Sequence, residues 1–226
     1  MFIGHFAPAF AARAISEESP KLGTLFIAAQ LVDWAFYIFA IVGIEHYRVE
    51  PGFTVMKPFD FYDYPITHSL LGTSIWALGF GLLILLSYRN TVAATWAVIV
   101  VLSHWLLDFV SHGPDLTIAG GEMRYGLGLW NHPVTAIAVE LAITLGAFAW
   151  YMTRTKGPLL PPYILLAVLL ILQAINWMGS GPAEVTPGLS IAALVAFALV
   201  TALAYWVQST RWHKNKVGLA VPVMRR

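Results

Sequence analysis

Three titratable side chains fall on one face of a long apolar stretch. His104, Asp108 and His112 are spaced four residues apart, within and just after the segment 91–111. Each step of four residues turns only about 40° around an α-helix, so the three side chains project from one stripe. Their nitrogen and oxygen donors suit zinc, manganese or iron. A buried His–Asp pair that joins two helices is the structural alternative, and this helix alone favours neither interpretation.

Other histidines and acids can join this stripe. His68 stands at the start of the preceding apolar stretch, in the segment YPITHSL. The start of one span and the end of the next, antiparallel span lie on the same side of the membrane. His68 should therefore lie level with Asp108 and belong to the same site. Asp33 lies halfway along the first apolar stretch and could supply a second carboxylate. Asp33 is also a candidate catalytic base.

Glu140 lies in the middle of a later apolar stretch. It could face the same cavity as a general base, or it could form a structural hydrogen bond to another helix through Gln30, Gln173 or Asn176. An ionisable side chain at the bilayer centre costs at least ~2.5–3.5 kcal/mol on insertion scales. All these residues should therefore face the protein interior and find partners there.

The composition places these residues in a membrane protein. The chain has 226 residues, of which 58% are hydrophobic and 11% charged, whereas soluble domains have about 45–50% apolar and about 25% charged residues. The absence of cysteine excludes disulfides, thiolate metal sites and a cysteine nucleophile. A formal charge of +1 gives no reason to expect a nucleic-acid partner. Membrane lipids are the expected surroundings.

Hydropathy predicts an all-α bundle of about six transmembrane helices, because each span needs about 20 apolar residues. No repeat or linker divides the chain, so we expect one transmembrane domain, 1–226, with the chemical motifs in the half 1–115 and the rest in 116–226. The predicted spans are 22–44, 66–88, 91–111, 129–152, 160–178 and 189–208.

The basic residues predict the orientation. In a six-helix arrangement only Arg48, Lys57 and Arg124 lie on one side, and every other Lys and Arg lies on the opposite side. Cytoplasmic loops carry the excess of basic residues, so both termini should be cytoplasmic. The segment 45–65, rich in aromatic and acidic residues, would then lie on the outer side, either as a lid over the site or packed on the surface.

The segment 1–14 is apolar but too short to span. It could be an amphipathic helix on the inner surface. It could instead be a half-membrane helix that dips into the bundle and carries His5 to the depth of Asp33. The sequence supports both interpretations equally.

The order of the motifs resembles that of a known family. Gly4-His5, an Asp in the next helix (Asp33), THSL at 67–70 and SHWLLD at 103–108 follow one another. This order is similar to that of the YdjM-like family of membrane-bound metal-dependent hydrolases, a bacterial inner-membrane group, over the chain to about Asp115. The resemblance implies that the metal ligands are His5, Asp33, His68, His104 and Asp108. Family members often carry Pro-Asp-x-Asp where this chain reads LVDWA at 31–35, so one carboxylate is missing and a two-metal site is not expected.

These observations lead to one functional hypothesis and two rivals. We expect an integral-membrane hydrolase that uses a divalent metal ion, with zinc favoured over manganese or iron, on a small amphiphilic or lipid-like substrate. The first rival is an ion or proton transporter, although the sequence displays no repeat and no pair of broken helices. The second is an accessory subunit of a membrane complex, holding haem between His68 and His104 or having only a structural polar core.

Overall fold

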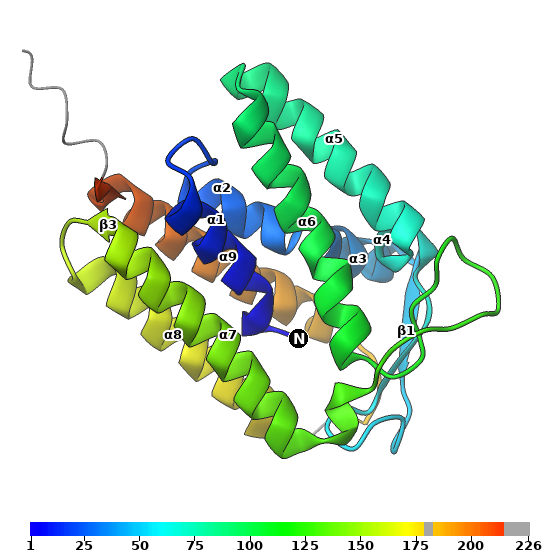
Figure 1. Cartoon of the computed structure of the whole chain (residues 1–226). Coiled ribbons are helices and arrows are strands. Elements are labelled where there is room, and N and C mark those ends of the chain that lie inside the picture. Colours follow the sequence, from blue (N-terminus) through cyan, green and yellow to red (C-terminus); the bar gives the residue numbers. More distant parts are fainter. Residues whose placement is uncertain (179–182, 215–226) are drawn as a thin grey trace, which may run out of the picture.

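The computed structural model describes residues 1–178 and 183–214 as a helical bundle (Figure 1). In this part of the chain, five helices are long and apolar enough to cross a membrane, and a bent pair adds a sixth candidate span. This confirms the prediction of an all-α membrane bundle. The pair is α2 (Leu22–Ala29) and α3 (Leu31–Val42), and the five helices are α5 (Leu70–Tyr88), α6 (Thr91–Ser111), α7 (Pro133–Arg154), α8 (Leu160–Met178) and α9 (Pro187–Thr210).

Local signals set the ends of these helices. The side chains of Ser69 and Asn90 accept hydrogen bonds from backbone N–H groups in the first turns of α5 and α6, which satisfies donors that the helix leaves free. α7 and α9 begin with Pro133 and Pro187. Proline lacks a backbone N–H, but in the first turn of a helix this group has no partner within the helix, so its absence does not destabilise the helix. α3 ends at Gly43, which adopts a left-handed conformation with φ 74°.

Three predicted spans differ from the observed elements. The first is bent by 51° at Gln30, between α2 and α3. The second is divided by Ser69, whose extended backbone separates the short α4 (Pro65–His68) from α5. The fourth starts with a separate 3-10 turn, η2 (Leu129–Asn131), because Pro133 begins a new helix. The bend at Gln30 makes the first span a broken helix, whereas the sequence had given no sign of a broken helix.

The N-terminal segment lies inside the bundle. It forms the 3-10 turn η1 (Ile3–Phe6) and then α1 (Ala7–Ile15), which lies beside α7 in Figure 1. Ile3, Phe6 and Phe10 are fully buried. The ring of Phe10 packs against Phe26 of α2 and Phe148 of α7, with centroids 5.3 and 5.5 Å apart. Of the two interpretations of this segment, the structure supports the half-membrane helix.

Two small antiparallel strand pairs occur in the described chain, and only the first is a hairpin. β1 (His46–Val49) pairs with β2 (Phe59–Asp63) beside the end of α6 that carries the site, and β3 (Thr155–Lys156) pairs with β4 (Trp212–His213) at the opposite end. Three aromatic side chains of the β1–β2 hairpin, those of Tyr47, Phe59 and Phe61, line a cavity, whereas Tyr62 is exposed. The acidic and aromatic segment therefore covers the site, as a lid would.

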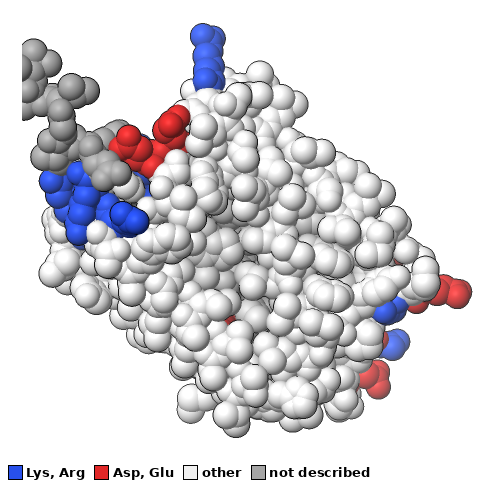
Figure 2. Space-filling view, viewed as in Figure 1, with Lys and Arg blue, Asp and Glu red and all other residues white. Residues whose placement is uncertain are grey.

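Charged side chains gather at the two ends of the molecule. Figure 2 shows Lys, Arg, Asp and Glu at opposite ends of the visible face, separated by a broad band in which the only charged atoms in view are a small acidic patch inside a hollow. Large apolar side chains such as Leu78, Leu82 and Leu86 are exposed along α5. A belt of exposed apolar side chains between charged ends is the surface that lipid covers.

Replacing Phe10 tests whether the N-terminal helix is part of the core. Phe10→Ala should destabilise the protein by about 3–5 kcal/mol, because it leaves a cavity among three aromatic rings. The measurement is the apparent midpoint of thermal unfolding in detergent. Ile75→Ala, at a position 62% exposed on α5, is the control and should change little. An unchanged midpoint for Phe10→Ala would place the segment outside the bundle.

Candidate metal centre

Five of the predicted site residues converge inside the bundle. His5 comes from η1, Asp33 from the first turn of α3, His68 from the end of α4, and His104 and Asp108 from α6. Two groups of three could each hold a metal ion, with one potential ligand atom per residue and all three atoms within 4.8 Å of one another. These groups are His5, His104, Asp108 and Asp33, His68, His104. Because both groups include His104, and one imidazole nitrogen binds one ion, they describe a single centre.

The distances between donor atoms match those around one ion. Ligands at about 2.0–2.1 Å from a tetrahedral ion lie about 3.3 Å from one another. His104 Nε2 lies 3.1 Å from Asp108 Oδ2 and 3.6 Å from Asp33 Oδ1. His5 Nε2 is 3.1 Å from Asp108 Oδ1, and His68 Nε2 is 3.2 Å from Asp33 Oδ1. The backbone nitrogen of Met1 also lies 3.0 Å from Asp108 Oδ1.

Hydrogen bonds behind the centre fix two of the imidazoles. His104 Nδ1 donates to the carbonyl oxygen of Ala29 at 2.8 Å, at the end of α2 where the chain bends. His68 Nδ1 lies 2.7 Å from Thr67 Oγ1, and this hydroxyl donates to the buried carboxylate of Glu45 at 2.6 Å. Each Nδ1 therefore carries the proton, and each Nε2 presents a lone pair to the centre. Second-shell bonds of this kind orient metal-binding histidines.

Buried polar atoms without partners indicate what the centre accommodates. In the described part of the chain, His104 Nε2 and both ring nitrogens of His5 form no hydrogen bond. Asp33 faces the lone pairs of His68 and His104, an arrangement that is repulsive unless a cation or further protons lie between them. The donor set thus fits a divalent ion. It leaves no room for haem between His68 and His104, because an oxygen of Asp33 lies within 3.2 and 3.6 Å of the two nitrogens.

His112 is a member of neither group, but it contacts Asp108 of the centre. Its Nε2 lies 3.3 Å from Asp108 Oδ1, and its Nδ1 lies 3.2 Å from Asp115, which also accepts from the hydroxyl of Tyr64. Burial lowers the pKa of His112, but the adjacent Asp115 and Asp108 more than offset this and raise it to about 9. His112 thus contacts the centre through Asp108 and belongs to neither of the two groups of potential metal ligands.

Glu140 holds the N-terminal segment in place. Its carboxylate accepts from the backbone N–H groups of Phe2, at 2.6 Å, and Gly4, at 3.2 Å, and from the side-chain amide of Gln173, at 3.1 Å. The amide of Gln173 in turn accepts from the backbone N–H of Ile3. Of the hydrogen-bond partners proposed for Glu140, Gln173 is the one observed, and the contact positions the segment that carries His5.

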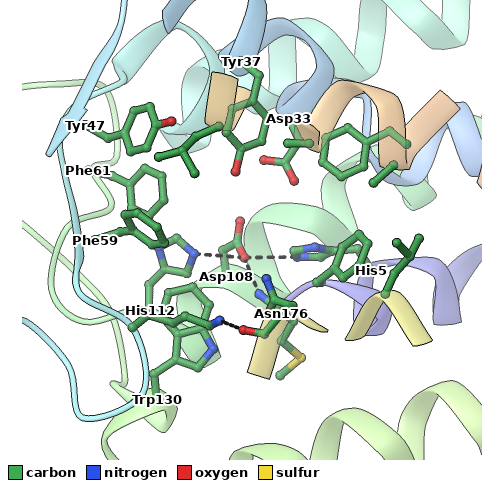
Figure 3. Close-up of a pocket in the computed structure, with 18 of the residues that line it drawn as sticks. His5, Asp33, Tyr37, Tyr47, Phe59, Phe61, Asp108, His112, Trp130 and Asn176 are labelled. Carbon is green, nitrogen blue, oxygen red and sulfur yellow. Dashed lines mark hydrogen bonds and ion pairs between the residues drawn. The ribbon is translucent and has the colours of Figure 1, made fainter. Parts of the chain in front are cut away.

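The centre lies at one end of a cavity of about 440 Å³ with mostly apolar walls. Figure 3 shows Asp33 and Tyr37 on one side of this space and Asp108 and His112 on the other, with Phe59 and Phe61 of the β1–β2 hairpin at the edge. Asp33 is the most accessible of the five converging residues, with its side chain 19% exposed. A ligand in the cavity would therefore meet Asp33 and Asp108 directly.

Sequence patterns missed several supporting groups. Glu45 accepts from the backbone N–H groups of Ile66 and Thr67, and so caps α4 from a distant segment. The carbonyl of Ala29 becomes an acceptor only because the first span bends. Lys57 lines the cavity but is a single basic residue in a loop. The one local signal was Thr67, which precedes His68 in the THSL motif.

No family model matches the chain, and no curated protein and no solved structure matches it either. The chemistry of the centre must therefore be inferred from its own geometry.

Removing the shared ligand tests the metal centre. His104→Ala should abolish stoichiometric binding of zinc, manganese or iron, because both three-residue groups lose the same nitrogen. The measurement is metal content by mass spectrometry after reconstitution of detergent-purified protein with each ion. His132→Ala, at an exposed histidine outside the cluster, is the control and should retain the metal. Wild-type protein that binds none of the ions would contradict the metal centre and leave a protonated His–Asp cluster.

Thr67→Val tests the hydrogen bonds behind the ligands. The change removes the acceptor of His68 Nδ1 and should weaken metal affinity by about 10–100-fold, measured by competition with a chelator. Thr144→Val is the matched control, since Thr144 is equally buried on α7 and its hydroxyl has no hydrogen-bond partner in the described residues. Equal affinities in the two variants would mean that the orientation of His68 does not matter.

Proposed function

We propose that this protein is an integral-membrane, metal-dependent hydrolase of the YdjM-like family that acts on an amphiphilic or lipid-like substrate. The observation that carries the proposal is the convergence of His and Asp donors on the shared His104, beside a mostly apolar cavity that His5, His68 and Asp108 help to line. Concave sites with apolar walls and a few convergent polar groups are typical of small-molecule binding sites. The depth of the centre within the bundle makes a membrane amphiphile the natural substrate.

The residues divide into binding and positioning roles. His104, His68 and His5 would hold the ion through their Nε2 atoms, with Asp108 between them. A divalent ion bound there would supply a water of lowered pKa, near about 7, and would polarise an acyl or phosphoryl oxygen. Zinc is favoured by this nitrogen-rich donor set, with manganese and iron as alternatives.

Asp33 is the candidate general base. It is the carboxylate that the cavity reaches most readily, and its Oδ1 lies 3.2 Å from His68 Nε2 and 3.6 Å from His104 Nε2, at the edge of the centre. A base at this position can take a proton from the attacking water. Glu140 suits this role less well, because both of its oxygens already accept hydrogen bonds. We assign Glu140 to positioning His5.

The proposed location is a bacterial inner membrane, with both termini cytoplasmic. The motif resemblance and the uneven distribution of Lys and Arg support this orientation. The cavity and the β1–β2 hairpin would then face the outer side, and a substrate would reach the centre from the outer leaflet.

Transport of an ion or proton is the second candidate function, and the bent first span favours it. Transporters place binding sites beside discontinuous helices near the middle of the membrane, and Asp33 lies in the first turn after such a break. A flux assay in proteoliposomes with a pH-sensitive dye separates the two functions. Metal-independent proton flux that Asp33→Asn abolishes would support transport.

Turnover tests the hydrolase directly. Protein in lipid nanodiscs, loaded with zinc, manganese or iron, should cleave members of a panel of single-chain esters and phosphoesters. His104→Ala should reduce cleavage to background, and Asp33→Asn should lower kcat by about 10²–10⁴-fold if Asp33 is the base. His132→Ala should leave kcat unchanged. Wild-type protein that binds metal but cleaves no member of the panel with any ion would refute the hydrolase.

A further inference from the structure

The cavity extends from the metal centre into an apolar slot between two helices. α8 and α9 pack side by side (Figure 1), and the end of α8 and the start of α9 contribute to the wall of the cavity. Ile175 in this wall is 63% exposed. The slot is lined by Leu172, Ile175, Leu189, Ala192, Ala193 and Ala196.

The shape and chemistry of the slot suit one linear apolar chain. Three of its residues on α9 are alanines, whose small side chains leave space along the helix without offering a polar partner. The whole cavity, at about 440 Å³, is within the range of about 300–1,000 Å³ found for small-ligand sites. That volume accommodates a head group and part of one chain, while further apolar material would remain in the membrane.

A basic residue lines the same cavity. Lys57, which follows β1, donates through Nζ to the backbone carbonyl of Asn176 in the last turn of α8. Burial lowers the pKa of Lys57 to about 8, partly offset by the charge of Glu140, so the side chain is still mostly protonated near pH 7. Within the described residues, no carboxylate lies within ion-pair distance of it.

The other two basic residues at this end of the molecule already have partners. Arg48 forms an ion pair with Asp60 at 2.8 Å, and Arg124 donates to the backbone carbonyls of Tyr62 and Asp115. Neither lines the cavity. Of the described Lys and Arg residues at this end, Lys57 is therefore the one that lines the cavity.

We infer that the cavity binds an anionic single-chain amphiphile, with its charged head between Lys57 and the metal centre and its chain in the slot between α8 and α9. The inference rests on the proposed function for what happens to this molecule and narrows its substrate class. Binding itself requires only the slot and Lys57. The head group would become a second partner of the Lys57 ammonium beside the carbonyl of Asn176, and the chain would reach the lipid past Ile175.

Photo-crosslinking tests this binding mode without using turnover. The probe is dodecyl phosphate with a diazirine near the middle of its chain, added to the protein in nanodiscs. Labelled peptides should map to 172–175 and 189–196. Ala193→Trp should reduce this labelling by at least about tenfold, because the added ring fills the slot. Val195→Trp, on the same helix at a position 61% exposed and outside the cavity lining, is the matched control and should retain the labelling.

The charge of the head group is tested separately. Lys57→Gln should weaken binding of dodecyl phosphate by about tenfold, the value expected for one charge-assisted hydrogen bond, and Lys57→Arg should restore it. Dodecanol should compete poorly with the probe, and inorganic phosphate alone should not displace it. Competition by dodecanol as strong as by dodecyl phosphate would overturn the preference for an anion, and displacement by inorganic phosphate would overturn the role of the chain.

The outcomes separate this inference from the hydrolase. Label spread over the lipid-facing residues of all helices, and unchanged by Ala193→Trp, would refute the slot even if the protein cleaves a substrate. Specific slot labelling in a protein that cleaves nothing would preserve the binding site and refute the hydrolase. Ala193→Leu provides a smaller obstruction if the Trp variant fails to elute as a monodisperse species, and it should reduce labelling in the same direction.

Discussion

Two carboxylates within an apolar bundle need compensating partners, and most of the structure near the centre follows from supplying them. Burying an ionised carboxylate without a partner is far more costly than a typical net folding stability allows. Asp108 is surrounded by His5, His104 and His112 at 3.1–3.3 Å, and Asp33 faces His68 and His104. These partners come from η1, α4 and α6, so regular straight spans could not have brought them together.

At each place where a helix near the centre is interrupted, other groups of the protein form hydrogen bonds with the backbone atoms that the interruption leaves free. Backbone groups at membrane depth are tolerated only when the protein satisfies them. The bend at Gln30 exposes the carbonyl of Ala29, which accepts from His104. The separation of α4 from α5 leaves two sets of free N–H groups, capped by Glu45 and by the hydroxyl of Ser69. Glu45 thus satisfies the backbone of α4 and, through Thr67, orients His68, while the Ala29 carbonyl at the bend orients His104.

The sequence contained enough information for the spans and for most of the site, but not for the interruptions. Hydropathy is a property of about 20 consecutive residues, so it predicted the spans well. The spacing of His104, Asp108 and His112 predicted a shared face, and the structure confirms that these side chains meet. The bend at Gln30 gave no local signal, since neither Pro nor Gly occurs among residues 28–31. The segment 1–14 has the same composition on a membrane surface as inside a bundle, and contacts with Glu140 and Gln173 decide between the two.

Those contacts also impose an order on biosynthesis. The backbone N–H groups of Phe2, Ile3 and Gly4 are held by side chains on α7 and α8, which leave the ribosome more than a hundred residues after the segment they hold. Before α7 and α8 are made, the N-terminal segment can contact only α2 and α6, for example through Phe26 and Asp108. The hydrogen bonds that fix the backbone around His5 therefore form only after most of the chain has been inserted.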